Sequence, residues 1–126
     1  MSAIAPRRAL AVTAMSLLLL GAASAQASDA TDIALRAGFL FGHAFRCGVS
    51  DARLKASAAM VNGLIAAYSL SGDDELAARS EFIEHAAVSA GPMRPAEAAP
   101  SCDLVRAQLA RFERHYRRLD ARRAAQ

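Results

Sequence analysis

The sequence predicts an all-α protein, a small up-down-up-down four-helix bundle with one disulfide, preceded by a cleaved signal peptide. Apolar residues recur at steps of three and four in four separate segments, which is the period of a helix with one buried face. No segment alternates convincingly with the two-residue period of a half-buried strand, and the chain is rich in alanine. A chain of 126 residues holds at most one small domain, which excludes large multi-domain enzymes.

The first 25 residues have the three regions of a secretory signal peptide. A short start carrying Arg7 and Arg8 precedes an apolar run over 9–20 and then a small, polar stretch. We expect cleavage after residue 25, with cleavage after residue 27 as the alternative. The apolar run is shorter than the roughly 20 residues that cross a bilayer, so we expect no stable membrane insertion. The segment predicts export to a bacterial periplasm and leaves a single helical domain over 28–123.

Two helices are expected in the first half of this domain. The first covers 29–46 and stops at Gly48, because glycine is common just beyond helix C-termini. The second starts after Ser50, whose hydroxyl suits an N-cap, and ends at Ser71–Gly72. The residues expected to face the core are Ile33, Ala37, Leu40, Phe41, Ala44 and Phe45 in the first helix and Leu54, Ala58, Val61, Leu64, Ile65 and Tyr68 in the second.

Two further helices are expected in the second half. Asp73 is the expected N-cap of the third helix, which closes at Gly91–Pro92. The proline-rich stretch 91–100 predicts an irregular connection, and Ser101 caps the last helix. The residues expected to face the core are Leu76, Ser80, Ile83, Ala87 and Ala90 in the third helix and Val105, Leu109, Phe112, Tyr116 and Leu119 in the fourth.

The two cysteines fit this topology. Cys47 lies at the end of the first helix and Cys102 at the start of the fourth, and these two ends meet at the same pole of an up-down-up-down bundle. The periplasm is oxidising, so we expect a disulfide, which in the loop-entropy model would stabilise the fold by about 4 kcal/mol. The alternative, a soft-metal site of both thiols with His43, supplies too few ligands for a closed zinc site.

The opposite pole of the bundle is expected to gather carboxylates. Asp73, Asp74 and Glu75 follow a glycine, and the same pole should hold Asp29 and Asp32. Hard cations such as calcium or a lanthanide take six or more oxygen ligands, mostly anionic. The alternative is that these acids only stabilise a helix N-terminus or pair with arginines of the last helix.

Charge is unevenly distributed over the domain. Removal of the signal peptide leaves 13 basic against 12 acidic side chains, a balance that argues against a nucleic-acid partner. Between Asp103 and Arg123, however, seven arginines face three acids, while Asp73 to Glu84 carries five acids and one arginine. Such a dipolar surface favours a charged protein partner or self-association. The arginines expected to contact such a partner are Arg114, Arg117 and Arg118.

Catalytic motifs are missing from the sequence. There is no nucleophile elbow, no phosphate-binding glycine loop and no haem-attachment motif. Glu81 and His85 share one helical face and form a weak candidate for a ligand or acid-base pair. We therefore expect a non-enzymatic binding protein.

Two family resemblances accompany these patterns. The export signal, the acidic turn and the compact two-cysteine region resemble small periplasmic lanthanide-binding proteins of methylotrophic bacteria, of the landiscernin type. The resemblance implies a surface site formed by Asp73, Asp74 and Glu75, with Glu81 the next acid within reach. Such a site supplies too few oxygens for a lanthanide, so water or a second molecule would complete it, which would link two copies into a homodimer.

The second resemblance is to the acid-stress holdase chaperones of the periplasm, in size and in the single long-range disulfide. The primary hypothesis from the sequence is an exported protein that binds a hard cation, a lanthanide or calcium, through its acidic turn. The alternative is a holdase or adaptor that binds protein partners through an apolar surface or the arginine-rich last helix.

Overall fold

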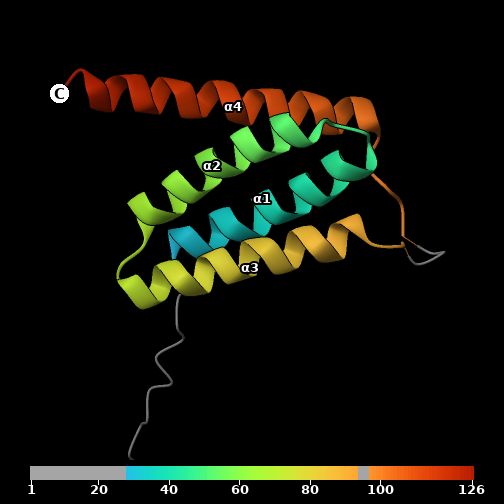
Figure 1. The fold of residues 1–126 in the computed structure, drawn as a ribbon, viewed down its shortest axis with the longest axis horizontal. Helices are drawn as coiled ribbons and strands as arrows, with labels where there is room; N and C mark the ends of the chain where they lie inside the picture. Colours follow the sequence, from blue (N-terminus) through green and yellow to red (C-terminus); the bar gives the residue numbers. More distant parts are fainter. Residues whose placement is uncertain (1–27, 94–96) are drawn as a thin grey trace, which may run out of the picture.

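The computed structural model describes residues 28–93 and 97–126, so the predicted signal peptide lies outside the described residues. These residues contain four α-helices and no strand, and successive helices run in opposite directions (Figure 1). The helices are α1 (Asp29–Arg46), α2 (Asp51–Tyr68), α3 (Gly72–Ala90) and α4 (Cys102–Ala124). The predicted all-α, four-helix fold is confirmed.

Each helix begins directly after a serine. The side-chain oxygens of Ser28, Ser50, Ser71 and Ser101 each accept the backbone N–H of the third residue beyond, at 3.2, 3.3, 3.1 and 3.2 Å. This bond satisfies one of the donors that every helix N-terminus leaves free. The prediction that Asp73 caps the third helix is wrong, because Ser71 does so and α3 starts at Gly72.

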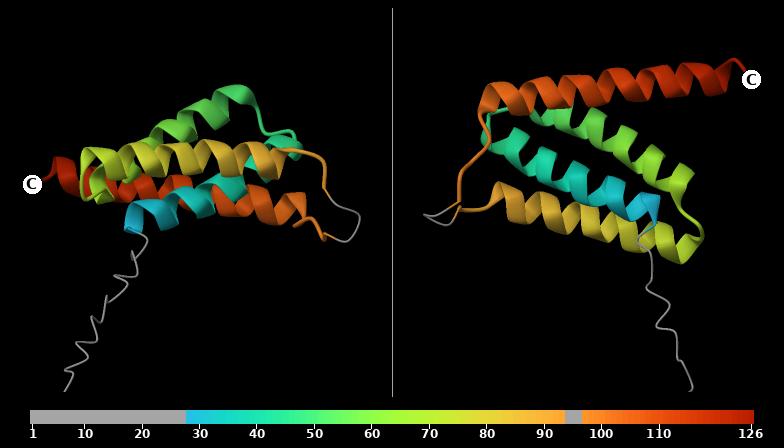
Figure 2. Two further views of the ribbon diagram at one scale, coloured as in Figure 1. Left: turned by 90° about the horizontal axis from the view of Figure 1, so that it is seen from below. Right: turned by 180° about the vertical axis from the view of Figure 1, so that it is seen from behind.

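α1 is the central helix. Figure 1 shows α3 on one side of α1, with α2 and α4 on the other, and Figure 2 shows the same arrangement from two more directions. Small residues occur at every fourth position of α1, at Ala30, Ala34, Gly38 and Gly42, and all four are buried. Residues four apart form a ridge along a helix. α3 lies so close to this ridge that a methyl group at Gly38 would lie 2.9 Å from the Phe82 carbonyl oxygen.

The predicted inner face of the third helix is wrong. Leu76 and Ile83, expected in the core, are 69% and 68% exposed, whereas Ala78 and Phe82 are buried. Both sets have helical spacing, so the period alone does not choose between them. The glycines of α1 determine which face of α3 is buried, because only a face with small residues can approach them closely. On the same face, Phe82 packs edge-on against Phe41, with ring centroids 5.2 Å apart.

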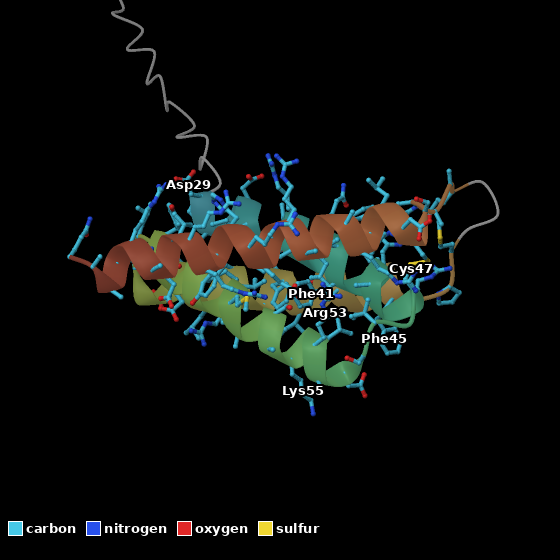
Figure 3. All side chains as sticks on the ribbon, turned by 90° about the horizontal axis from the view of Figure 1, so that it is seen from above. Asp29, Phe41, Phe45, Cys47, Arg53 and Lys55 are labelled. Atoms are coloured by element: carbon cyan, nitrogen blue, oxygen red, sulfur yellow. A yellow bond between two sulfur atoms is a disulfide. The ribbon has the colours of Figure 1, made fainter. Side chains whose placement is uncertain are left out.

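Two other core predictions are wrong. Phe45 and Tyr68, each at or next to the end of its helix, are 57% and 42% exposed. Figure 3 labels Phe45 close to the start of α2. The other predicted core residues of α1, α2 and α4 are buried or partly buried, as expected. The buried ones include Ala37, Phe41, Ala44, Val61, Leu64, Ile65, Val105 and Leu109.

The predicted disulfide is confirmed. It joins Cys47 to Cys102, whose Cα atoms lie 5.4 Å apart. A second contact acts at the same place, because the Arg106 guanidinium donates a hydrogen bond of 2.6 Å to the Cys47 carbonyl oxygen. Together these contacts hold the start of α4 against the end of α1.

An ion pair that sequence reasoning missed holds the middle of α4 against α2. Glu113 is buried, and its carboxylate accepts hydrogen bonds from both Nε and Nη2 of Arg53, at 2.9 and 3.0 Å, and from the Ser57 hydroxyl at 2.7 Å. Figure 3 labels Arg53 in its place on α2. The Arg53 hydrogen bonds lower the pKa of the Glu113 carboxyl from its ordinary value, against the opposing effect of burial.

Substitution of Gly42 by alanine tests the close approach of α1 and α3. The new methyl group would lie 2.6 Å from the Ala86 carbonyl oxygen and also meet the Ser89 side chain, so the helices must separate. We expect the free energy of unfolding to fall by about 1–3 kcal/mol in a urea titration followed by circular dichroism. Gly72→Ala is the control, because nothing lies within 4 Å of its new methyl group. Equal stability of the two variants would contradict the close contact.

Acid titration tests the Glu113 ion pair. Because the pKa of Glu113 is lower in the folded protein, its stabilisation is complete above the ordinary glutamate pKa and is lost as pH falls through the folded value. We expect Glu113→Gln to lower the free energy of unfolding at pH 7 by about 1–3 kcal/mol. The difference from the parent protein should shrink towards pH 3. Glu84→Gln, on an exposed side chain, serves as control, and a pH-independent difference would refute the assignment.

Candidate functional site

Within the acidic turn, which consists of Asp73, Asp74 and Glu75, Asp74 connects neighbouring helices. One carboxylate oxygen of Asp74 accepts a hydrogen bond of 2.8 Å from the Ser28 hydroxyl, and the other accepts one of 2.8 Å from the Leu70 backbone N–H. Asp74 thus ties the start of α1 to the turn between α2 and α3. Both of its oxygens are used within the fold.

The other acids near this pole are either paired locally or isolated. Glu75 pairs with Arg79, and Asp32 pairs with Arg36, each one helical turn away. Asp73 is exposed and forms no salt bridge with any described residue. Within 28–93 and 97–126, no group of three or more histidine, cysteine or acidic side chains is placed to hold a metal ion.

The fourth predicted metal ligand, Glu81, lies two turns further along α3. Its carboxylate is 3.3 Å from Nε2 of His85, and the sequence predicts that these two residues share one helical face. Glu81 is thus separated from Asp73 by eight positions of one helix, about 12 Å along its axis. The structure therefore does not bring the four predicted ligands together.

The alternative, in which arginines of the last helix pair with the acidic turn, does not occur among the described residues. No Cα atom of α3 lies within 8 Å of one in α4, and no salt bridge among the described residues joins these helices. Arg117 lies 4.0 Å from Glu113 of its own helix instead. The last turns of α4 extend past the ends of the other helices (Figures 1 and 2).

The three predicted partner-binding arginines separate into two groups. Arg114 and Arg118 join Arg111 and His115 around a surface hollow of about 310 Å³ that α4 forms alone. Arg117 lies on the other side of the helix, next to Glu113. We call Arg111, Arg114, His115 and Arg118 the basic patch.

An apolar groove between α1 and α4 borders this patch. The cavity has a volume of about 370 Å³, within the range of binding pockets in proteins. Apolar side chains dominate its lining, and it shares His115 with the basic patch. We call it the α1–α4 groove, and its lining consists of Ile33, Arg36, Ala37, Leu40, Phe41, Leu64, Phe112 and His115.

Basic residues line both walls of the groove. Arg36 contributes a guanidinium from α1, and His115 lines the wall from α4. A neighbouring hollow of about 390 Å³ on α4 shares Phe112 and His115 with the groove and is also lined by Arg111 and Gln108. An apolar floor with a cationic border suits a ligand that combines apolar and negatively charged groups.

No sequence pattern predicts this groove directly. Ile33, Leu40 and Phe112 are expected core residues, and they are only partly buried because the fourth helix does not close over α1 along its whole length. Arg36 and Arg111 belong to no sequence motif that indicates binding. The uneven charge of the last helix was the one pattern that pointed to this region.

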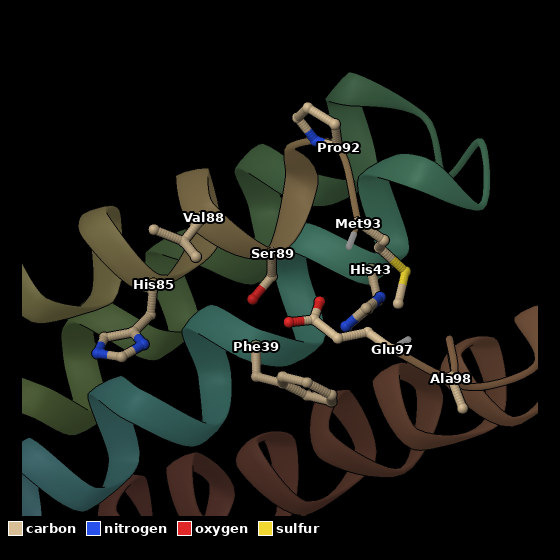
Figure 4. Close-up of a pocket in the computed structure, with 9 residues that line it drawn as sticks. All are labelled: Phe39, His43, His85, Val88, Ser89, Pro92, Met93, Glu97 and Ala98. Carbon is tan, nitrogen blue, oxygen red and sulfur yellow. The ribbon is translucent and has the colours of Figure 1, made fainter. Parts of the chain in front are cut away.

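A second cavity lies between α1, α3 and the connection that follows α3. It has a volume of about 360 Å³, and Figure 4 shows the carboxylate of Glu97 directed towards His43 and Ser89. His43 is buried, and its ring packs edge-on against Phe39 with centroids 4.3 Å apart. This packing is typical of a buried structural histidine.

Comparison with known proteins gives no match for this chain among protein families, curated proteins or solved structures. Among the described residues, none of the helices combines the length and the hydrophobicity of a membrane span.

The cation hypothesis stays a prediction, and a metal titration tests it. It expects saturable binding of La³⁺ or Ca²⁺ by the purified protein, measured by calorimetry, and about tenfold weaker binding for Asp73→Asn, because affinity depends on ligand charge. Asp74→Asn is less informative, since Asp74 also bonds Ser28 and Leu70. Binding that is absent, only millimolar, or unchanged in Asp73→Asn contradicts the hypothesis.

Proposed function

We propose that this chain is an exported, non-enzymatic adaptor that binds an acidic amphipathic helix of a partner protein in the α1–α4 groove. The observation that carries the proposal is the continuity of an apolar groove with the basic patch. Helix-in-groove recognition uses this combination, in which apolar side chains at helical spacing fill the groove and charged ones contact its border.

The groove has the geometry that such a helix needs. Ile33 and Leu40, on its α1 wall, are seven residues apart, which corresponds to about 10 Å along the helix. A docked helix with apolar residues at positions i and i+7 matches this spacing. Leu64 and Phe41 provide a buried floor, so apolar side chains entering the groove would leave water.

Charge decides which kind of helix fits. The border provides Arg36 on one side and Arg111 and His115 on the other, and no acid is among the described residues that line the groove or the neighbouring hollow. Asp32 pairs with Arg36. A basic helix would be repelled, and a neutral one would gain only from its apolar side chains. Acidic residues that flank the apolar stripe add attraction and direct the approach.

A binding assay with a designed peptide tests the proposal. The probe is a labelled amphipathic helix with leucines at i and i+7 and glutamates beside them, followed by fluorescence anisotropy. We expect Arg111→Glu with Arg118→Glu to weaken binding about tenfold, and affinity to fall steeply with salt, because exposed charges are screened. The same peptide with glutamine in place of glutamate should bind less tightly.

The matched control is Arg123→Glu with Arg122→Glu, which makes the same charge change at exposed positions beyond the groove. These variants should bind the peptide with nearly parental affinity. Equal weakening by both pairs of substitutions would indicate nonspecific attraction to a basic helix and would overturn the proposal. A holdase would instead suppress client aggregation with little dependence on Arg111 and Arg118.

A further inference from the structure

α3 presents an apolar stripe that nothing in the described chain covers. Leu76 and Ile83 are 69% and 68% exposed, and Ser80 and Ala87 continue the stripe at steps of three and four. Because α3 packs on α1 through its opposite, small-residue face, this outer stripe has no partner helix. We call Leu76, Ser80, Ile83 and Ala87 the α3 stripe.

The α3 stripe has the apolar spacing and the flanking acids of the helix that we propose as the ligand of the α1–α4 groove. Leu76 and Ile83 are seven residues apart, the same spacing as Ile33 and Leu40 in the groove. Asp73 and Glu84 fall on one flank of the stripe, and neither forms a salt bridge with any described residue. The α3 stripe is thus an exposed surface of mainly apolar side chains with an acidic flank.

We infer that the groove of one copy of this chain binds the α3 stripe of a second copy. This inference rests on the proposed function, because it assigns an occupant to the same groove. α3 carries five acids and one arginine, whereas α4 carries seven arginines and three acids, so the two surfaces attract each other. A symmetric contact of α3 with α3 would instead place acids against acids.

The contact is heterologous, because the stripe and the groove belong to different helices of each copy. Each molecule therefore has one donor surface and one acceptor surface. This property allows an experiment that separates the inferred contact from any symmetric one.

Sedimentation velocity of the purified protein at increasing concentration is the first measurement. We expect the average mass to rise above that of a monomer at low salt and to fall back at 1 M NaCl, where the screening length is about 3 Å. Leu76→Lys with Ile83→Lys should weaken association at least about tenfold, and so should Arg111→Glu with Arg118→Glu. Val88→Lys is the control, since Val88 is 71% exposed on α3 outside the stripe.

The decisive measurement mixes the two double variants. The stripe variant keeps an intact groove and the groove variant keeps an intact stripe, so the mixture should form a complex of one copy of each and grow no further. A monomeric parent protein at all concentrations overturns the inference. Association that depends on the stripe and not on the groove also overturns it, because that result indicates a symmetric contact through α3.

The peptide assay keeps this test separate from that of the proposed function. If the parent protein stays monomeric while the acidic peptide still binds the groove, the partner is another protein and only the self-association is refuted. If the copies associate as inferred, the peptide should compete and return the average mass to that of a monomer. Association that the peptide leaves unchanged refutes binding of the stripe in the groove.

Discussion

The contact between α1 and α3 determines how the rest of the chain is arranged. Gly38 and Gly42 allow the α3 backbone to approach so closely that no other side chain fits between the helices. Dispersion contacts accumulate over such a surface, although each one is weak. The close approach also fixes which face of α3 is buried. Its consequence is that Leu76 and Ile83 of α3 remain at the surface while Phe82 is buried.

The position of α4 follows from different forces. The disulfide and the Arg106 hydrogen bond hold its first turn against the end of α1, and the Glu113 ion pair holds its middle against Arg53 of α2. Beyond Glu113 few side chains of α4 are buried, and its arginines face solvent. Between these points Val105 and Leu109 are buried in the core, whereas the later part of α4 does not cover α1 completely. The α1–α4 groove is the space that remains.

The sequence predicted the number, order and approximate ends of the helices because apolar period and helix start and stop residues are local properties. It also predicted the disulfide, since the ends that carry Cys47 and Cys102 meet in any up-down-up-down bundle. The inner face of α3 could not be predicted in the same way. Two competing stripes have helical spacing there, and the choice depends on Gly38 and Gly42, more than thirty residues away.

The predicted acidic site illustrates a second limit. Asp74 and Glu75 lie at the expected pole, but whether they are available to a cation depends on hydrogen-bond partners that spacing does not reveal. Ser28 and Leu70 occupy the Asp74 carboxylate, and Arg79 pairs with Glu75. Glu113 was missed for the opposite reason, since an acid within an arginine-rich helix gives no sign that it is buried.

The walls of the α1–α4 groove come from the first and last helices of the domain. A chain still emerging from the ribosome or a translocation channel has α1 but lacks the opposite wall. The proposed recognition through this groove would therefore require both helices, and loss of α4 would abolish it while the α1–α3 pair stays intact.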